Sequence, residues 1–297
     1  MPLVTRRALL TAGGAGFLMS AAGGAYAGLI EPSLMLDVTE YRPTPPGWPA
    51  DLPLTIAVIS DVHVCEPYVP IGRVQRIVET VNRLKPDLIV HLGDHEATSR
   101  KIAARRVPPR EWAAAYADLS APLGLYTVLG NHDWWHNADE IRRALDGARI
   151  RVMSNEAELI EHAGRRFWLC GLGDQLAHWL KRGGFRGEDD LPGTLAQLKT
   201  DDPALLLAHE PDIFAQVPAR VSLTLSGHTH GGQVYIPHLR NPFIPSAYGG
   251  RFRYGHIVED DRHLIVSGGI GMSGLPVRFG VPPEIVLVRL GQQSAIV

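Results

Sequence analysis

The sequence contains few cysteines and no marked excess of either charge. With 2 cysteines in 297 residues, it has no disulfide framework, and a single bridge between Cys65 and Cys170 is neither required nor excluded. The 29 basic and 31 acidic residues nearly cancel, for a formal net charge of −2. Nucleic-acid binding needs a surplus of Lys and Arg to neutralise phosphates, so no nucleic-acid partner is expected. A hydrophobic share of 45% against 20% charged residues is typical of a globular protein and excludes disorder over most of the chain.

The first 27 residues resemble a targeting segment. Arg6 and Arg7 precede an uncharged, Gly- and Ala-rich stretch, and Ala25-Tyr26-Ala27 matches a small-x-small cleavage pattern. A paired arginine before a weakly apolar stretch is typical of a twin-arginine export signal. This predicts recognition by the twin-arginine export machinery and a periplasmic or cell-envelope location. The alternative is an uncleaved membrane anchor, since the uncharged stretch is just long enough to span a bilayer.

The remaining chain divides into a Pro-rich lead-in, residues 28–53, and one domain, residues 54–291. The lead-in is expected to be extended, with an edge strand near residues 34–41. A 3.6-residue apolar period predicts a helix over residues 71–84, closed by Lys85-Pro86. Further helices are expected over residues 110–119 and 138–145, and two more strands lie over residues 263–267 and 284–290.

Five apolar runs in the domain each end on a residue that is able to bind a metal. Continuous apolar runs of this length favour strands buried on both faces, as in helix-covered sheets. Strands alternating with helices predict an α/β fold whose strands end along one edge. The runs cover residues 54–60, 87–93, 125–130, 204–208 and 221–227, and they lead into Asp61, Asp94, Asn131, His209 and His228.

Two motifs add further ligands near these strand ends. Asp61-Val62-His63 and His228-Thr229-His230 place two side chains two residues apart. In an extended segment this spacing puts both on the same side, so convergence is expected without a special turn. A mixed set of oxygen and imidazole donors suits Mn²⁺, Fe or Zn²⁺ and argues against Ca²⁺ or a thiolate site.

In this order, the motifs D-x-H, G-D, G-N-H-D, H and G-H-T-H resemble the calcineurin-like metallophosphoesterase superfamily over residues 54–290. The segments around Asp61, His209 and His228, and Leu275-Pro276-Val277-Arg278-Phe279, look like its exported bacterial branch of YkuE-type and YaeI-type phosphodiesterases. The resemblance implies a sandwich of mixed β-sheets flanked by helices.

The resemblance also implies the site. One ion is held by Asp61, His63 and His230, a second by Asn131, His209 and His228, and Asp94 bridges the two. Two such ions lower the pKa of a shared water, orient the phosphorus and neutralise charge during an in-line displacement. His132, beside a ligand, is the candidate acid that protonates the leaving alkoxide. Asp133 or a backbone carbonyl is expected to orient His132.

One departure from the phosphoprotein phosphatases bears on the substrate. In that branch the G-D motif continues to an aspartate and an arginine, whereas Ala97 stands at the aspartate's position here. The chain is therefore expected to hydrolyse a phosphodiester or pyrophosphate bond in a phospholipid, a cell-envelope diester or a UDP-diacylglucosamine-like compound. The last of these is cytoplasmic and conflicts with export. A phosphomonoesterase and a non-catalytic metal-binding scaffold stay open as alternatives.

Other residues have less definite roles. Arg278 is a candidate for bidentate binding of a substrate phosphate or for a structural ion pair. His91 and His95 have no assigned role. Residues 179–186 mix aromatic and basic side chains, and they form either a rim for an anionic or lipid headgroup substrate, with membrane-surface association, or a solvated loop.

Overall fold

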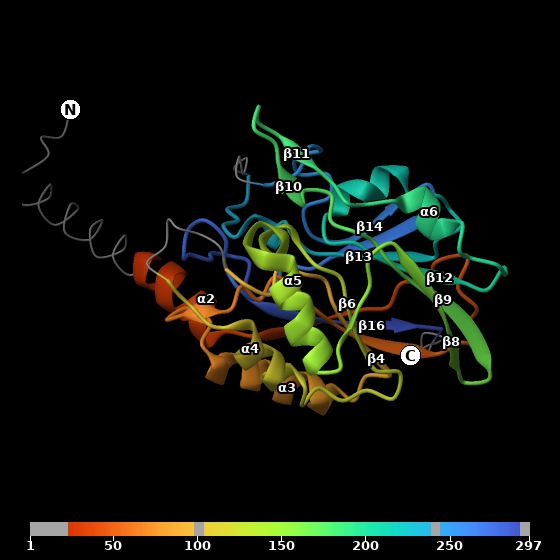
Figure 1. Ribbon diagram of the computed structural model, residues 1–297, viewed down its shortest axis with the longest axis horizontal. Coiled ribbons are helices and arrows are strands. Elements are labelled where there is room, and N and C mark those ends of the chain that lie inside the picture. The colour runs from red at the N-terminus through yellow and green to blue at the C-terminus, as the bar shows by residue number, and fades with distance from the viewer. Residues whose placement is uncertain (1–22, 98–103, 239–243, 292–297) are drawn as a thin grey trace, which may run out of the picture.

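Two β-sheets stacked on each other form the body of the molecule (Figure 1). The computed structural model describes residues 23–97, 104–238 and 244–291. Most of the predicted signal, residues 1–22, lies outside this range. In the part of the chain that the structure describes, no helix is long and apolar enough to cross a membrane.

The first sheet has six strands, and β2, β4, β6 and β7 run parallel while β16 is antiparallel to β2. Its order is β1 (Asp37–Tyr41), β16 (Glu284–Leu290), β2 (Leu54–Ile59), β4 (Leu88–His91), β6 (Leu125–Thr127) and β7 (Arg151–Val152). The second six-stranded sheet has parallel inner strands and antiparallel edge strands. Its order is β14 (Gly255–Glu259), β15 (Arg262–Val266), β13 (Leu223–Ser226), β12 (Ala204–Leu207), β9 (Arg165–Gly171) and β8 (Glu156–His162).

The central strands are buried on both faces, as their continuous apolar sequences predict. In β2, Leu54 and Ile56 face the core between the two sheets, whereas Ala57 and Ile59 face the helices. In β12, Leu205 lies in the same inter-sheet core. Side chains alternate along a strand, so each apolar run contributes to two cores at once.

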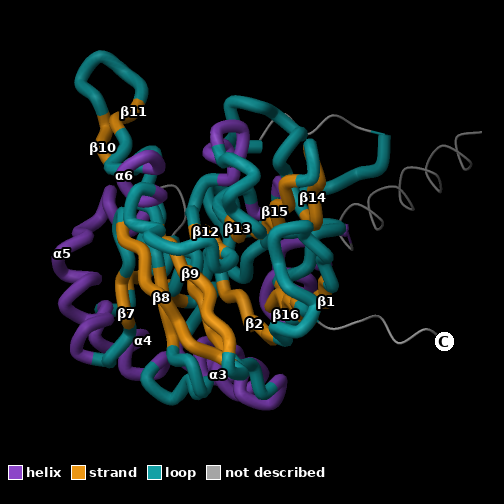
Figure 2. Tube along the Cα trace, turned by 90° about the vertical axis from the view of Figure 1, so that its right-hand side faces the viewer, coloured by secondary structure: helices purple, strands orange, loops and turns teal. Residues whose placement is uncertain are grey.

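Helices cover the outer face of each sheet (Figures 1 and 2). Val74, Ile77 and Trp112 pack on the first sheet, and Phe214 packs on the second. The mixed α/β sandwich flanked by helices is thus confirmed. On the first sheet the helices are α3 (Ile71–Leu84), α4 (Pro109–Tyr116) and α5 (Asn131–Gly147), and on the second they are α6 (Leu191–Leu195) and the 3₁₀ helix η2 (Pro211–Gln216).

Helix α5 begins earlier than the predicted 138–145. It starts at Asn131, where the Asp133 carboxylate in the first turn accepts the N–H of the preceding Gly130 at 3.0 Å. A break at Asn137 (φ −163°) separates this first turn from the periodic part that the sequence indicates. The first turn of α5 is therefore built by capping rather than by an apolar stripe.

The lead-in, residues 28–53, begins as helix, and its extended part is the edge strand β1 (Asp37–Tyr41). Residues Tyr26–Ile30 form a π-helical turn (η1) that continues into the helix α2 (Glu31–Leu34), which corrects the expectation of extended chain there. The Glu31 carboxylate accepts the backbone N–H groups of Gly280 and Val281 at 3.0 and 2.8 Å. This buried tertiary contact holds the segment against the loop before β16.

Three short elements complete the description. The strands β10 (His178–Trp179) and β11 (Phe185–Arg186) form a hairpin that projects beyond the body in both views (Figures 1 and 2). A second pair, β3 (Cys65–Glu66) and β5 (Arg105–Arg106), lies near the carboxyl end of β2, and η3 (His230–Gly232) follows β13. Cys65 and Cys170 are both buried and unbridged.

Candidate metal centre

All seven predicted ligands lie just beyond the carboxyl ends of strands from both sheets, and all are buried. The stacked sheets bring these strand ends to one edge, where α/β folds place their sites. Asp61 and His63 follow β2, Asp94 follows β4, Asn131 follows β6, His209 follows β12, and His228 and His230 follow β13.

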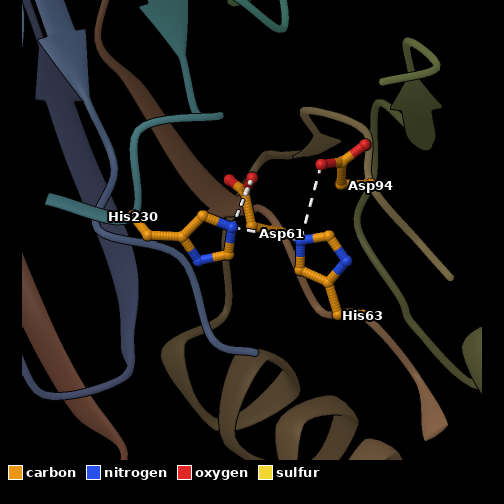
Figure 3. Close-up of side chains that lie close together, drawn as sticks. All are labelled: Asp61, His63, Asp94 and His230. Carbon is orange, nitrogen blue, oxygen red and sulfur yellow. Dashed lines mark hydrogen bonds and ion pairs between the residues drawn. The ribbon is translucent and has the colours of Figure 1, made fainter. Parts of the chain in front are cut away.

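One group of donors comprises Asp61, His63, Asp94 and His230, which point toward one another in Figure 3. The Nε2 atoms of His63 and His230 lie 3.0 Å apart. His63 Nε2 is 3.4 Å from Asp94 Oδ2, and His230 Nε2 is 3.5 Å from Asp61 Oδ1. The four residues therefore enclose one position.

A second group comprises Asp94, Asn131, His209 and His228. His209 Nε2 lies 3.3 Å from Asp94 Oδ2, 3.2 Å from Asn131 Oδ1 and 3.3 Å from His228 Nδ1. Asp94 Oδ2 thus faces both groups, which is the place of a bridging ligand.

The donor spacing suits a cation in each group. Donors bound to one ion at about 2.1 Å lie about 3.0 Å apart at octahedral angles and about 3.4 Å apart at tetrahedral angles. The tautomers agree with this, since Nδ1 of His63 and of His209 lies 3.1 and 2.6 Å from the carbonyl oxygens of Glu96 and Leu92. A carbonyl oxygen only accepts, so Nδ1 carries the hydrogen and the Nε2 lone pair of the neutral ring faces the centre. The residues present therefore fit divalent ions.

Left-handed backbone conformations, which the residue spacing did not predict, bring these ligands together. Asp61, His63, Asp94, His228 and His230 all adopt positive φ, between 47° and 67°. The expectation that D-x-H and H-x-H converge from extended segments is therefore wrong. Non-glycine residues occupy the left-handed region at a cost, and they do so here in tight turns directly after β2, β4 and β13.

Burial and charge interactions shift the pKa values of several of these ligands. Burial lowers the pKa of His230 well below its usual range, and the His63 ring acts in the same direction. Although burial raises the pKa of Asp94, the charge of the His209 ring and its hydrogen bond to the carboxylate outweigh burial and hold that pKa well below the usual range. Metal ligands need a neutral imidazole and an ionised carboxylate, and the shifts of His230 and Asp94 favour these forms. The shifts of two other ligands oppose them: Asp94 outweighs burial and raises the pKa of His209 well above its usual range, and burial raises the pKa of Asp61.

His132 lies beside the centre without entering either group. Its backbone N–H donates to Asp94 Oδ1 at 2.8 Å, and its ring meets the His63 ring edge-on with centroids 4.7 Å apart. Its Nε2 is 3.3 Å from Ser273 Oγ. Burial lowers the pKa of His132 to about 4, which Asp94 only partly offsets, so the ring is neutral at pH 7.

Asp133 does not take the role of orienting His132. Its carboxylate accepts the backbone N–H groups of Asp94, His95 and Gly130 at 2.9–3.0 Å and lies 2.9 Å from His95 Nδ1. The His95 ring stacks on His91 with centroids 3.9 Å apart. These two histidines, unexplained by the sequence, thus support the loop that carries Asp94.

Arg278 lies against His230, and its guanidinium group is directed to backbone carbonyls. Its side chain is fully buried, and Nε, Nη1 and Nη2 donate to the carbonyl oxygens of Gly271, Val281 and Gly268 at 2.9–3.0 Å. Nη2 also lies 3.3 Å from His230 Nδ1. The structure therefore favours a structural role for Arg278 over phosphate binding. Its partners are backbone carbonyls and not the acidic side chain of an ion pair.

A buried carboxyl pair, which the sequence reasoning did not identify, borders the second group. Asp174 and Glu210 lie with His209 in one cluster of donor atoms. Asp174 Oδ1 accepts the Leu176 N–H at 2.8 Å and Glu210 Oε2 accepts the Gln175 N–H at 3.1 Å. Burial and the adjacent Glu210 raise the pKa of Asp174 well above its usual range. Glu210 directly follows His209 in the sequence, but no local pattern indicates its partner.

The comparisons with known proteins agree with this geometry. The model of the calcineurin-like phosphoesterase family matches residues 54–232. The chain is 30% identical over 293 residues to the metallophosphoesterase YkuE of Bacillus subtilis, which covers 93% of this chain and 92% of that protein. It is 29% identical over 248 residues to the phosphodiesterase YaeI of Escherichia coli, covering 80% of this chain and 82% of YaeI.

Animal relatives are longer. A transmembrane protein with a metallophosphoesterase domain from Danio rerio is 30% identical over 250 residues, which are 80% of this chain and 53% of that protein. The match to a relative from Caenorhabditis elegans covers 48% of the length of that protein. Together with the two donor groups around Asp94, the family match over most of the domain shows that the chain belongs to the calcineurin-like phosphoesterase family and is a metal-dependent phosphoesterase.

Proposed function

We propose that the protein hydrolyses a phosphodiester or pyrophosphate bond at a centre of two divalent ions. Asp61, His63 and His230 would hold one ion, Asn131, His209 and His228 the other, and Asp94 both. Ions bound there supply Lewis-acid polarisation of the phosphoryl group and an activated water. The observation that supports this most strongly is the position of Asp94 Oδ2, 3.4 Å from His63 Nε2 and 3.3 Å from His209 Nε2. Mn²⁺, Fe and Zn²⁺ suit this donor set.

The chain's own residues supply positioning and proton transfer. The Asp94 carboxylate is oriented by the His132 N–H, and the Nδ1–H groups of His63 and His209 are held by carbonyl oxygens. His132 is placed to protonate the leaving oxygen. An anionic phosphoester beside the ring would raise its pKa from the low value of the free site.

The preference for a diester or pyrophosphate rests on charge. The reacting phosphoryl group of a phosphomonoester carries close to two negative charges at neutral pH, whereas that of a diester or of a doubly substituted pyrophosphate carries one. The N–H groups of Arg278 donate to backbone carbonyls and so do not offset a second phosphate charge. Ala97 stands where phosphoprotein phosphatases carry an aspartate. The name of YaeI, a phosphodiesterase, points in the same direction. Candidate substrates are phospholipids, cell-envelope diesters and UDP-diacylglucosamine-like pyrophosphates.

Hydrolysis assays on the purified protein test this proposal. With Mn²⁺ added, hydrolysis of bis-p-nitrophenyl phosphate is expected to exceed that of p-nitrophenyl phosphate. Asp94→Asn is expected to lower kcat about 100-fold or more and to reduce the metal content measured by mass spectrometry. A monoester preference would make the protein a phosphomonoesterase, and no turnover with bound metal would make it a scaffold.

We also propose that the protein is exported through the twin-arginine machinery to the periplasm or cell envelope, where it stays anchored if residues 1–27 are not removed. The support is the Arg6-Arg7 pair and the weakly apolar stretch that follows. Replacing both arginines, Arg6→Lys with Arg7→Lys, is expected to retain the protein in the cytoplasm, as cell fractionation would show. Unchanged export of this variant would refute the twin-arginine route.

A further inference from the structure

The tip of the β10–β11 hairpin exposes apolar side chains. Figures 1 and 2 show this hairpin projecting from the body. Trp179 is 63% exposed and Leu180 is 46% exposed. A monomeric protein gains nothing in stability from two large apolar residues placed in water at the end of an arm, so such exposure commonly marks an interaction surface.

The same tip is basic in an otherwise acidic chain. Residues 179–186 include Lys181, Arg182 and Arg186 and no acidic residue, whereas the whole chain has a formal charge of −2. Lys181 and Arg182 are exposed, and neither pairs with an acidic group among the described residues. An anionic partner is therefore favoured over a cationic one.

Aromatic packing fixes the arm relative to the metal centre. The Trp179 ring lies 4.7 Å from the Trp135 ring and 4.4 Å from the Phe185 ring, measured between centroids. Trp135 Nε1–H donates to the Leu176 carbonyl at 2.9 Å, and the Trp135 ring lies 5.0 Å from the His132 ring. The arm thus stands directly beside the residue that flanks both metal groups.

Apolar side chains also border the other side of His132. Ser273, whose Oγ lies 3.3 Å from His132 Nε2, leads into a loop where Leu275 is 65% exposed. The Phe279 carbonyl accepts the Tyr235 N–H at 2.7 Å, and the Tyr26 ring meets the Phe279 ring edge-on at 6.1 Å. The segments around Phe279, Tyr235 and the amino-terminal helix therefore lie side by side.

These segments and the hairpin hold most of the large hydrophobic residues that are exposed. Of the twelve large hydrophobic residues that are exposed among the described residues, nine belong to them. The nine are Leu29, Ile30, Leu34, Trp179, Leu180, Tyr235, Ile236, Leu275 and Phe279. We call this set the apolar rim.

We propose that the hairpin tip, Trp179, Leu180, Lys181 and Arg182, docks the apolar rim and the mouth of the metal centre onto an anionic lipid surface. Tryptophan and tyrosine favour the membrane–water interface, leucine enters the acyl region, and basic residues attract anionic headgroups. Because the hairpin projects from the body (Figures 1 and 2), its tip can reach the interface of a bilayer ahead of the rest of the molecule. Docking there would present lipid-borne phosphoesters to the centre, a consequence that rests on the proposed hydrolysis, whereas the binding itself does not.

Vesicle flotation of the full-length protein tests the docking. Vesicles of phosphatidylcholine are compared with vesicles that also contain phosphatidylglycerol. The protein is expected to float with the anionic vesicles and to be released by salt. Lys181→Gln with Arg182→Gln is expected to weaken this binding about 30-fold, and Trp179→Ser with Leu180→Ser about 10-fold or more.

Matched variants carry the same changes elsewhere on the surface. Arg143→Gln with Lys199→Gln removes two exposed positive charges, and Val258→Ser removes an apolar residue that is 52% exposed outside the rim. Neither is expected to change flotation. The amino-terminal segment is present in every variant, so the comparison isolates the hairpin.

Two results would overturn the docking proposal. One is wild-type protein that stays in solution with both vesicle types, which would indicate a protein partner for the tip. The other is hairpin variants that float like the wild type. Hydrolysis of bis-p-nitrophenyl phosphate in solution, without vesicles, reports separately on the proposed function. The Lys181→Gln, Arg182→Gln protein is expected to retain that hydrolysis, which also shows that it is folded.

Discussion

At the scale of single residues, the metal centre depends on atoms that turn its ligands toward the ions. The carbonyl oxygens of Leu92 and Glu96 hold Nδ1–H of His209 and His63, so both Nε2 atoms face the centre. The Asp94 carboxylate is oriented by the backbone N–H of His132. Such supporting contacts set ligand direction and basicity, and losing one typically costs 10–100-fold in metal affinity or activity.

His132→Ala tests proton transfer at this scale. Removing the ring is expected to have little effect on the hydrolysis of an alkyl p-nitrophenyl phosphodiester, because the p-nitrophenolate leaving group needs no proton. Hydrolysis of diesters from which an alkoxide leaves is expected to slow about 100-fold or more. Rates measured across a series of leaving-group pKa values would show the difference, and equal losses for good and poor leaving groups would exclude the acid role.

Asp133→Asn tests the support under the Asp94 loop. The fully buried carboxylate accepts N–H groups from four backbone positions, Glu96 included, and faces the His95 ring. An amide would place its own N–H₂ against some of these donors, so the free energy of unfolding is expected to fall by about 3 kcal/mol. Urea denaturation measures this.

Asp139→Asn, an exposed change on the same helix, is the matched control and is expected to shift stability by less than about 0.5 kcal/mol. Equal changes in the free energy of unfolding for the two substitutions would show that the Asp133 contacts do not stabilise the fold.

At the scale of elements, the turns after the strands decide where ligands point. β2, β4 and β13 end before their ligands, and left-handed residues such as Asp61, Asp94 and His228 then reverse the chain within one or two positions. Gly130, at the start of α5, lets Asp94 and His209 approach, because a Cβ there would collide with the Asp94 carboxyl group and backbone and lie 2.7 Å from His209 Cε1. The helix start and the metal site are thus one structural unit.

Gly130→Ala is expected to lower metal content and kcat by about 10-fold or more, since the added methyl group displaces Asp94 or His209. Gly147→Ala, at the other end of α5, has no atom within 4 Å of the new Cβ and is expected to raise stability by up to about 1 kcal/mol through helix propensity. Metal analysis and thermal unfolding of the two variants would test this pair. Full metal occupancy in Gly130→Ala would contradict the role assigned to the close approach.

At the scale of the whole molecule, the metal centre connects the two sheets. Asp61, Asp94 and Asn131 come from the first sheet, whereas His209 and His230 come from the second. The sheets are otherwise joined by the apolar core between them. Ions bound at the centre would therefore link both layers at the edge where the core ends.

Metal removal is expected to lower thermal stability. A ligand present at about 1,000 times its Kd stabilises the folded state by about 4 kcal/mol, which corresponds to a drop in Tm of about 10 °C when a chelator removes it. Calorimetry with and without EDTA, followed by re-addition of Mn²⁺ or Zn²⁺, measures the effect. An unchanged Tm in protein whose metal loss is verified would show that the ions do not link the sheets.

Sequence patterns predicted the helix α3 and the strands that lead into the proposed ligands, whereas β7, β8, β9 and β14 were not predicted. The ligand set came from the ordered motifs and their resemblance to a family, and the structure brings those residues together. Apolar runs and a 3.6-residue period are local signals, and the ordered motifs around Asp61, Asp94 and His209 lie within a few residues of strand ends. The early start of α5 and the helical turn before β1 were missed, because they depend on a side-chain cap and on Glu31 reaching a loop about 250 residues away.

By itself, the sequence determined the α/β class, the strand ends that carry the donors and the family to which the chain belongs. Only the tertiary structure decided that Asp94 Oδ2 faces both groups, that Arg278 is directed to carbonyls, that Asp174 and Glu210 meet, and that Trp179 packs on Trp135 beside His132. The physical reason is that apolar periodicity and motif spacing act along the chain. Side-chain direction, burial and charge pairing depend instead on neighbours that only folding brings within a few ångströms.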